Sequence, residues 1–211
     1  MFSSVIQKID SLDKALLMLI NNAHSPWLDQ ILWTLTHTLP WIPFYLLALY
    51  LIFICYRRQT WKVLVVIVLA VSLADLTSSG ILKPLVQRPR PSHNPELTLH
   101  LHENTDGSLY KGGLYGFPSS HAANSSTIAI IVFLFLKKFY RRCWPLTLLL
   151  TSYVLVFCYT RVYLGVHYPS DILGGLLIGI IISIPMVKIA QKNTLFNFKS
   201  RIIKKFIKIN K

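Results

Sequence analysis

The sequence is poor in charged residues, and above all in acidic ones. Only 14% of the 211 residues are charged, and 8 Asp and Glu stand against 22 Lys and Arg. Soluble domains carry about 25% charged residues, so this composition argues against a soluble globular protein. A cage of acidic metal ligands is hard to build from so few carboxylates. This scarcity is consistent with a protein that uses no metal, and we expect no other cofactor.

Cysteine is also scarce, and the cysteines do not form an obvious pattern. There are three of them, in or next to apolar runs: Cys55, Cys143 and Cys158. Their odd number and their surroundings do not indicate a disulfide framework. We interpret them as small apolar residues of membrane helices.

Long apolar runs dominate what is present. The mean hydropathy is +0.49, and 53% of the residues are hydrophobic. A membrane-spanning helix needs about 20 mainly apolar residues. The sequence therefore predicts an all-α fold, a polytopic transmembrane helix bundle with five spans. They lie at residues 39–56, 61–82, 122–136, 145–164 and 170–187.

The predicted spans divide the chain into three parts. Residues 1–38 contain an apolar stretch interrupted by polar residues. This pattern predicts either an interfacial helix or a sixth span that would precede the other five. Residues 39–187 form the transmembrane domain. Residues 188–211 form a basic tail, which we expect either to lie on an anionic membrane surface or to be solvated.

Positive charge predicts the orientation of the bundle. Basic residues gather in the turn after residue 56, in the turn after residue 136 and in the tail. Alternation of the spans puts all three on one side, which the positive-inside rule makes cytoplasmic. The net charge of +14 suggests a polyanionic partner. Because the basic residues lie between apolar runs, we expect lipid phosphate rather than nucleic acid.

Three cations lie near the predicted outward ends of the spans: Lys83, Arg90 and Arg161. Together they would repel one another, and a bound phosphate would relieve this repulsion. Each one alone could instead extend towards the headgroup layer. Three cations at the same depth in the membrane favour a phosphate site. Arg88, two residues before Arg90, is a weaker candidate.

Two further groups of polar residues lie at the same level. Ser119, Ser120 and His121 follow Pro118 where a helix is expected to begin, and helix N-termini bind anions. His167 and Asp171 are four residues apart and would share one face of a helical turn. The carboxylate would then orient the imidazole as a base or nucleophile, opposite His121. An ordinary N-cap and a structural hydrogen bond are the alternatives.

These three groups resemble the signature of the type 2 phosphatidic acid phosphatase superfamily. Lys83 is separated by six residues from Arg90-Pro91, and the tetrapeptide 118–121 follows. Thr160-Arg161 then precedes His167 by five residues, and Asp171 follows after three more. Order and spacing agree with the family. The chain departs from it at Ser120, where the family has glycine, and at Thr160, where it has serine.

The resemblance implies a role for each matched residue. His167 would be the nucleophile that forms a phosphohistidine, with Asp171 orienting it, and His121 would protonate the leaving group and then activate water. The phosphate cradle would consist of Lys83, Arg90, Ser119, Ser120 and Arg161. No metal is required. Since Ser120 retains its backbone N–H, we expect activity to survive that departure.

The expected function is that of an integral membrane lipid phosphatase with its site on the extracytoplasmic side. For a bacterial inner membrane, undecaprenyl diphosphate is the first candidate substrate. Lipid A, phosphatidylglycerol phosphate and phosphatidic acid are alternatives, and so is phosphoryl transfer to another lipid. A protein of another class, a non-catalytic lipid-phosphate binder or transporter, could use the same cations but would not need the two histidines.

Two other polar features are left outside the site. The outer loop, residues 92–117, contains His100, His102 and Glu103, which could suggest a metal cluster. A solvated loop that shapes access of the lipid headgroup is the preferred interpretation. Glycines 112, 113 and 116 suggest turns close to the site. Asp75 lies within a predicted span and is expected to form a hydrogen bond to Ser or Thr inside the bundle.

Overall fold

The computed structural model describes residues 2–192, and its regular structure is helical apart from two isolated β-bridges. This confirms the all-α prediction. The α-helices are α1 (Phe2–Asn21), α2 (Pro26–Leu35), α3 (Ile42–Tyr56), α4 (Thr60–Asp75), α5 (Lys83–Val86), α6 (Ser120–Leu136), α7 (Trp144–Tyr163) and α8 (Pro169–Lys192). Most of the predicted basic tail, residues 193–211, lies outside the described residues.

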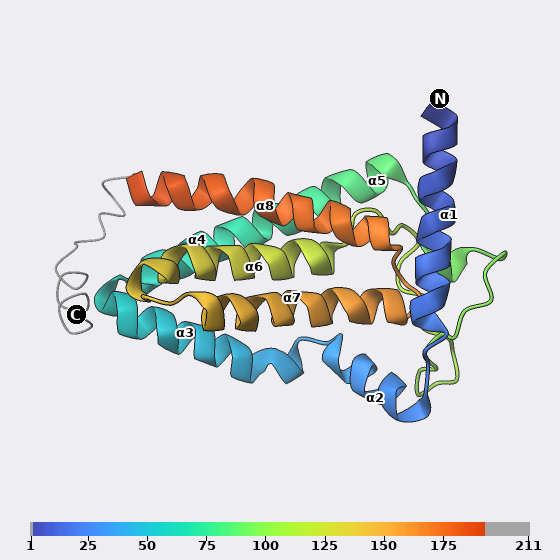
Figure 1. Cartoon of the computed structure of the whole chain (residues 1–211), viewed down its shortest axis with the longest axis horizontal. Helices are drawn as coiled ribbons and strands as arrows, with labels where there is room; N and C mark the ends of the chain where they lie inside the picture. Colours follow the sequence, from blue (N-terminus) through green and yellow to red (C-terminus); the bar gives the residue numbers. More distant parts are fainter. Residues whose placement is uncertain (1, 193–211) are drawn as a thin grey trace.

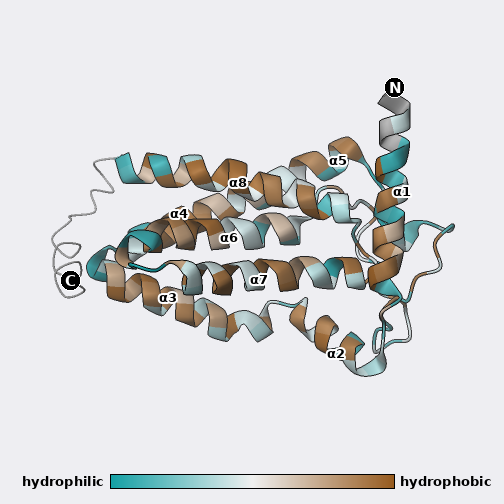
Figure 2. Cartoon of the chain, viewed as in Figure 1, coloured by the Kyte–Doolittle hydropathy of each residue, from teal (hydrophilic) through white to brown (hydrophobic). Residues whose placement is uncertain are grey.

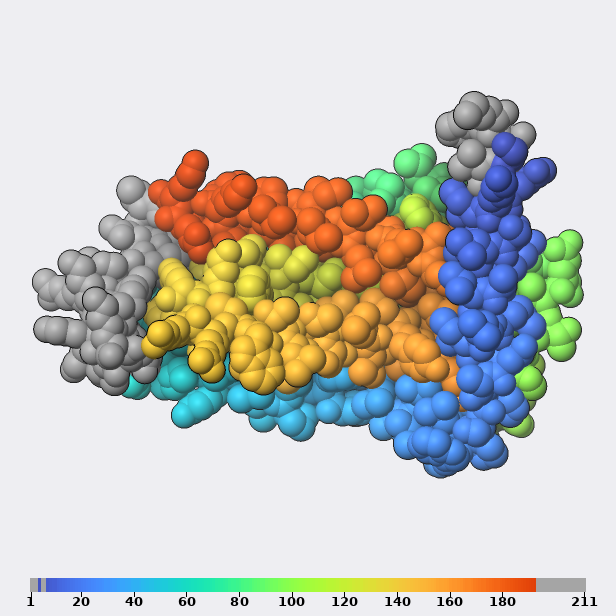
Figure 3. Space-filling view, in the orientation of Figure 1, coloured from blue at the N-terminus to red at the C-terminus, as the bar shows by residue number. Residues whose placement is uncertain are grey.

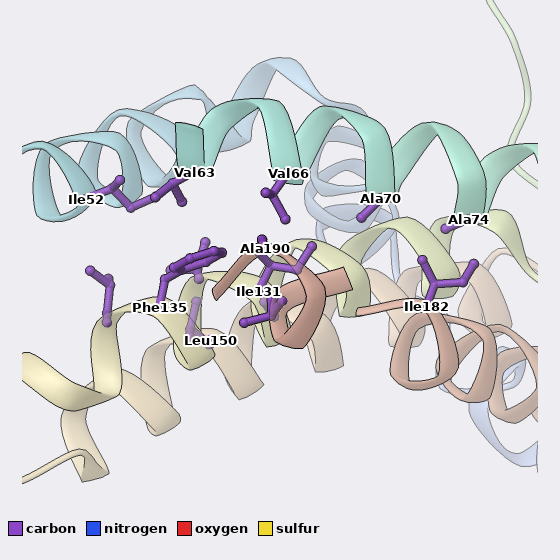
Figure 4. Packing of buried hydrophobic residues seen from close by; sticks show 14 of the residues in the cluster. Ile52, Val63, Val66, Ala70, Ala74, Ile131, Phe135, Leu150, Ile182 and Ala190 are labelled. Carbon is purple, nitrogen blue, oxygen red and sulfur yellow. The ribbon is translucent and has the colours of Figure 1, made fainter. Parts of the chain in front are cut away.

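The long axis of the molecule is the direction of α3, α4, α6, α7 and α8, and α1 lies across one end of them (Figure 1). The central helix is α6, which packs against α3, α4, α7 and α8. Apolar side chains from these helices form the largest core cluster, in which Val66 of α4, Ile131 and Phe135 of α6 and Ile182 of α8 take part (Figure 4). The bundle is thus organised around α6, whose first turn carries one of the predicted motifs.

Helices α6 and α8 approach each other closely because glycine faces the contact. A Cβ atom on Gly175 would lie 2.3 Å from the carbonyl oxygen of Ser119, and one on Gly179 would lie 2.0 Å from Ser126 Oγ. Small residues allow helix backbones to pack this closely inside membranes. The start of α6 is therefore held against α8.

The outer surface of the bundle is apolar, as Figure 2 shows by the brown helices. Large side chains such as Val68, Leu155 and Ile181 are more than 60% exposed. A soluble monomer rarely exposes apolar surface on this scale, whereas a lipid-facing bundle requires it. The protein is therefore an integral membrane protein.

Four helical stretches of residues 2–192 are long and apolar enough to cross a membrane. They are Leu39–Val86, Ser120–Phe139, Trp144–Tyr163 and Pro169–Lys192. The predicted count of five spans is not confirmed by this criterion. The longest stretch, of 48 residues, contains both α3 and α4, and the chain reverses between them at the turn Arg57–Gln59 (Figure 1). Neither α1 nor α2 is among the four.

The two ends of the bundle differ in their polar residues. The turn Arg57–Gln59, the turn Lys137–Phe139 and the end of α8 lie at one end (Figure 1). The other end carries α1, α2 and the long loop that follows α5. The basic turns therefore share one end, as the alternation of spans predicts.

Candidate active site

All three predicted motifs meet at the end of the bundle that α1 crosses. A π-helical segment, Leu76–Leu82, continues α4 and leads directly to Lys83. Ser120 and His121 begin α6, and Arg161 lies in the last turn of α7. His167 and Asp171 flank the start of α8. Residues that are far apart in sequence thus lie in one layer because four helical segments end there.

His167 and Asp171 form a fully buried pair. The Nδ1 atom of His167 lies 3.4 Å from Asp171 Oδ2, and both side chains have zero exposure. The backbone N–H of Tyr168 donates to the same carboxylate oxygen at 3.0 Å. Gly165, at φ +68°, allows the chain to turn between α7 and α8 just before this pair. The two side chains contact each other, although His167 lies in the bend before α8 rather than on the predicted helical turn.

The other ring nitrogen of His167 faces a cation. Arg90 Nη1 lies 3.1 Å from His167 Nε2 and donates to the carbonyl oxygen of Val166 at 3.2 Å. A guanidinium can only donate, so Nε2 accepts and the ring proton is on Nδ1, towards Asp171. The Nε2 lone pair therefore faces Arg90, one of the cations predicted to bind phosphate.

Burial and nearby positive charge determine the protonation of this group. Burial, followed by the charges of Arg90, Arg161 and Lys83, lowers the pKa of His167 well below its ordinary value. Burial and the charge of Arg161 also lower the pKa of Arg90, to about 10. At neutral pH the site therefore combines a neutral imidazole with charged guanidinium groups.

The start of α6 contributes a serine that accepts a hydrogen bond and a serine that caps the helix. Lys83 Nζ donates to Ser120 Oγ at 3.2 Å. Ser119 is fully buried, its side chain caps α6 by accepting from Ala122 N at 3.4 Å, and its N–H donates to the Asp171 carbonyl oxygen at 2.9 Å. Ser119 thus has the ordinary N-cap position. His121 follows Ser120 in the first turn and is half-buried.

Arg161 is buried among hydroxyl groups. Its Nη1 donates to Thr36 Oγ1 at 2.6 Å, and its Nη2 donates to the Tyr110 hydroxyl at 3.1 Å. Its Nε has no hydrogen-bond partner within the described part of the chain. A buried, charged donor without a partner is costly, and an anionic ligand would satisfy it.

Several residues of the site were not found from the sequence. Thr36 and Tyr110, which hold Arg161, belong to no motif and come from the end of α2 and from the outer loop. Arg88 contacts Asp171 Oδ1 at 2.8 Å instead of pointing to the phosphate site, and it also contacts Asp13 at 2.8 Å. Asp13 belongs to no motif, and Asp10 and Lys14 lie close to it on the same helix, so no feature of the sequence singled it out.

The outer loop packs closely against the site at two glycines. A Cβ on Gly116 would lie 2.8 Å from Asp171 Oδ2, and a Cβ on Gly112 would lie 3.1 Å from Arg90 Nη1. Gly112 and Gly116 therefore lie close to the site, although the backbone forms no hydrogen-bonded turn at either residue. The loop histidines stack on rings: His102 on Trp33 at 3.8 Å and His100 on His24 at 3.9 Å.

Asp75 lies outside this site. It accepts hydrogen bonds from Asn124 at 3.1 Å and from Ser79 at 3.5 Å. The serine partner agrees with the prediction, but the carboxylate lies on the bundle surface rather than inside it.

Residues 59–195 match the profile of the PAP2 superfamily. The lipid A 4'-phosphatase of Bacteroides thetaiotaomicron is 36% identical over 179 residues, which are 83% of this chain and 75% of that protein. Phosphatidylglycerophosphatase B of Bacillus subtilis is 27% identical over 181 residues, 82% of this chain and 81% of that protein. An undecaprenyl-diphosphatase of Sulfolobus acidocaldarius is 35% identical over 149 residues, 71% of this chain and 63% of that protein.

Solved structures show the same fold. A transmembrane PAP2-type phosphatidylglycerolphosphate phosphatase from Bacillus subtilis superposes with a TM-score of 0.66 at 22% identity, over 90% of each chain. LpxE of Aquifex aeolicus superposes with a TM-score of 0.58 at 27% identity, over 82% of this chain and 93% of that one. The profile match covers most of the chain, and it contains every residue of the three motifs. The chain therefore belongs to the PAP2 superfamily and is a phosphatase of that family.

Proposed function

We propose that this protein hydrolyses a phosphorylated membrane lipid through a phosphohistidine intermediate. The observation that carries the proposal is the buried His167, whose Nδ1 faces Asp171 and whose Nε2 faces Arg90. A neutral imidazole oriented by a carboxylate, next to cations, suits attack on a phosphorus atom.

In the first half-reaction the lipid phosphate occupies the space among Lys83, Arg90 and Arg161, with the N-terminal N–H groups of α6 as further donors. His167 Nε2 attacks phosphorus, so that an N–P bond forms while the bond to the lipid oxygen breaks. His121, in its protonated form, gives its proton to the leaving oxygen.

In the second half-reaction water attacks the phosphohistidine. His121, now neutral, takes a proton from this water, the N–P bond breaks and inorganic phosphate leaves. Asp171 holds the Nδ1 proton in both steps and stabilises the ring when it carries positive charge. Ser119 supports the site by capping α6, and Ser120 offers its N–H and hydroxyl.

For the substrate we propose the 4'-phosphate of lipid A ahead of undecaprenyl diphosphate, which the sequence alone put first. Two lipid A 4'-phosphatases, from Bacteroides thetaiotaomicron and Porphyromonas gingivalis, are 36% and 30% identical to the chain and cover 83% and 84% of it. Phosphatidylglycerol phosphate and phosphatidic acid follow.

We further propose five spans, formed by α3, α4, α6, α7 and α8, with the basic turns in the cytoplasm and the site on the outer side. Helix α1 would be interfacial: it crosses the end of the bundle, and Leu12, Leu16 and Leu19 are exposed along one side of it. The tail is proposed to lie on anionic lipid. Nucleic acid has no part in the function.

Phosphate release by the purified protein in detergent tests the proposed function. Lipid A, undecaprenyl diphosphate, phosphatidylglycerol phosphate and phosphatidic acid are offered in parallel, with and without EDTA. His167→Ala is the inactive variant, and His93→Ala, in an exposed position of the outer loop, is the matched control. EDTA-resistant release that only His167→Ala abolishes supports the mechanism. A folded wild-type protein that binds these lipids without releasing phosphate would favour the binder or transporter.

A further inference from the structure

Asp13 is a buried acid on the N-terminal helix α1. It is only 4% exposed, although most residues around it on α1 are exposed. Its Oδ2 accepts from Arg88 Nη2 at 2.8 Å, and its Oδ1 accepts from the backbone N–H of Ser170 at 2.9 Å. The hydroxyl of Ser170 donates to Asp13 as well. Asp13 therefore has several strong partners, none of them on its own helix.

These partners connect α1 to the start of α8. Ser170 directly precedes Asp171, and its N–H is one of the free donors at the N-terminus of α8. Arg88 lies between the two acids: Nη2 contacts Asp13, while Nη1 contacts Asp171 Oδ1 at 2.8 Å and Ser170 Oγ at 2.6 Å. The guanidinium also stacks on the Tyr168 ring, 4.2 Å from its centroid.

As a result, the two carboxylate oxygens of Asp171 have different partners. Oδ1 is occupied by Arg88, whereas Oδ2 is left for His167 and for the N–H of Tyr168. If Arg88 or the first turn of α8 moved, the carboxylate could rotate and the histidine would lose its partner. Groups that hold a carboxylate behind a functional imidazole commonly matter about 10–100-fold for function.

We propose that Asp13 is a positioning residue for the His167–Asp171 pair, acting through Arg88 and Ser170. This inference rests on the proposed function of that pair. It gives the N-terminal helix, which lies outside the residues matched by the family profile, a role in catalysis.

The charge of Asp13 should also affect the protonation of His167. The charged groups that act on His167 are Lys83, Arg90 and Arg161, with His121 on α6 and Asp171 on α8 also facing the site. Arg88 weakens the negative potential of Asp171, and Asp13 offsets part of the charge of Arg88. Removing the Asp13 charge would leave Arg88 acting fully on Asp171. Protonation of His167 would then become less favourable.

The test compares Asp13→Asn with Asp10→Asn in the full-length protein. Asp10 is the matched control because it lies one turn earlier on α1, is half-exposed, pairs with Lys14 at 3.0 Å and approaches Arg88 only to 4.0 Å. For Asp13→Asn we expect kcat to fall about 10–100-fold with KM within about threefold, since the phosphate-binding cations are untouched. The acidic limb of kcat/KM should move to lower pH. Asp10→Asn should stay within about twofold of wild type.

A purely structural role would have a different signature. It would lower the rate by one factor at every pH, in proportion to the folded fraction that a melting curve measures. Asp13→Glu, which keeps the charge, should recover part of kcat and restore the acidic limb. Wild-type kcat in Asp13→Asn, or a loss without any movement of the limb, would overturn the proposal.

A readout without turnover separates this proposal from the proposed function. In ¹⁵N-labelled protein, the His167 ring signal is assigned by its loss in His167→Gln. In the Asp13→Asn protein, the His167 ring should titrate at lower pH than in wild type, whether or not a lipid is hydrolysed. An unchanged His167 titration would reject the role of Asp13, whereas an inactive wild-type protein would reject the proposed function alone.

Discussion

His167 is a neutral residue in a strongly cationic site, and its surroundings explain why. Burial removes the solvation that a charged imidazole needs, and Arg90, Arg161 and Lys83 oppose a further positive charge. The carboxylate of Asp171 holds the Nδ1 proton, so that Nε2 carries the lone pair that faces Arg90. A substrate phosphate would bring negative charge next to these three cations.

The acidic limb of kcat/KM should therefore lie below pH 6.5, the ordinary pKa of histidine. Because the pKa of His167 is lowered, the ring takes up a proton only as the pH falls through this lowered value, and nucleophilic attack is lost there. Initial rates at low substrate concentration from pH 4 to 9 provide the measurement, with circular dichroism to monitor folding. A limb centred at or above pH 6.5 would contradict this assignment.

Ser120→Gly should remain active. The change removes the hydroxyl that accepts from Lys83 at 3.2 Å but keeps the backbone N–H. Loss of one such hydrogen bond costs about 1 kcal/mol, so we expect kcat/KM within about tenfold of wild type. Ser119→Ala is the comparison, because it removes the α6 cap and should lower the free energy of unfolding by about 1 kcal/mol. Inactivity of a folded Ser120→Gly protein would show that the hydroxyl itself is required.

Helix packing, more than any single contact, determines where the motifs meet. The continuous run of α4, the π-helical segment and α5 carries Lys83 to the site, and α6 carries His121. Helices α6 and α8 pack closely because Gly175 of α8 has no side chain and lets the backbone of Ser119 approach it. The same contact contains the hydrogen bond from Ser119 N to the carbonyl oxygen of Asp171.

Gly175→Ala should therefore reduce both stability and activity. Its new Cβ would lie 2.3 Å from the Ser119 carbonyl oxygen, so α6 or α8 must shift. Overpacking of this kind costs about 1–3 kcal/mol, and kcat should fall because the His121 and Asp171 ends of the two helices separate. Gly113→Ala is the control, since an added Cβ there meets no atom within 4 Å. Thermal melting and phosphate release are the measurements. Equal behaviour of the two variants would argue against the contact.

The polarity of the whole bundle follows from the opposite characters of its ends. Basic turns mark one end, while the site, α1 and the outer loop mark the other. In the space-filling view, α1 lies across the ends of α7 and α8 (Figure 3). An interfacial helix in this position would reach the site through Asp13 while its leucines remain in lipid.

Labelling with a membrane-impermeant maleimide should show this orientation. In a Cys143→Ser background, where Cys55 and Cys158 are buried, Thr105→Cys places a thiol on the outer loop and Arg141→Cys places one at the basic end. In right-side-out vesicles we expect labelling of the first and not of the second, which should react only after permeabilisation. The reverse pattern would put the site in the cytoplasm.

The helical class, the membrane-spanning character and the grouping of the three motifs could be predicted from the sequence, because they depend on local composition and on spacing within single segments. The four-residue step from His167 to Asp171 keeps the two side chains close wherever the segment lies. The number of spans stays a prediction, since α3 and α4 join through the short helical turn Arg57–Gln59 and together form one apolar helical stretch of 48 residues.

Only the tertiary structure decided which partner each cation takes. Arg88 and Arg90 are two residues apart in sequence, yet Arg90 faces His167 while Arg88 pairs with Asp171 and with Asp13, 75 residues earlier in the chain. Arg161 likewise meets Thr36 across 125 residues. Such contacts depend on how helices cross and on which side of each helix is buried. Neither can be obtained from one segment alone, whereas the spacing of residues within one motif can be.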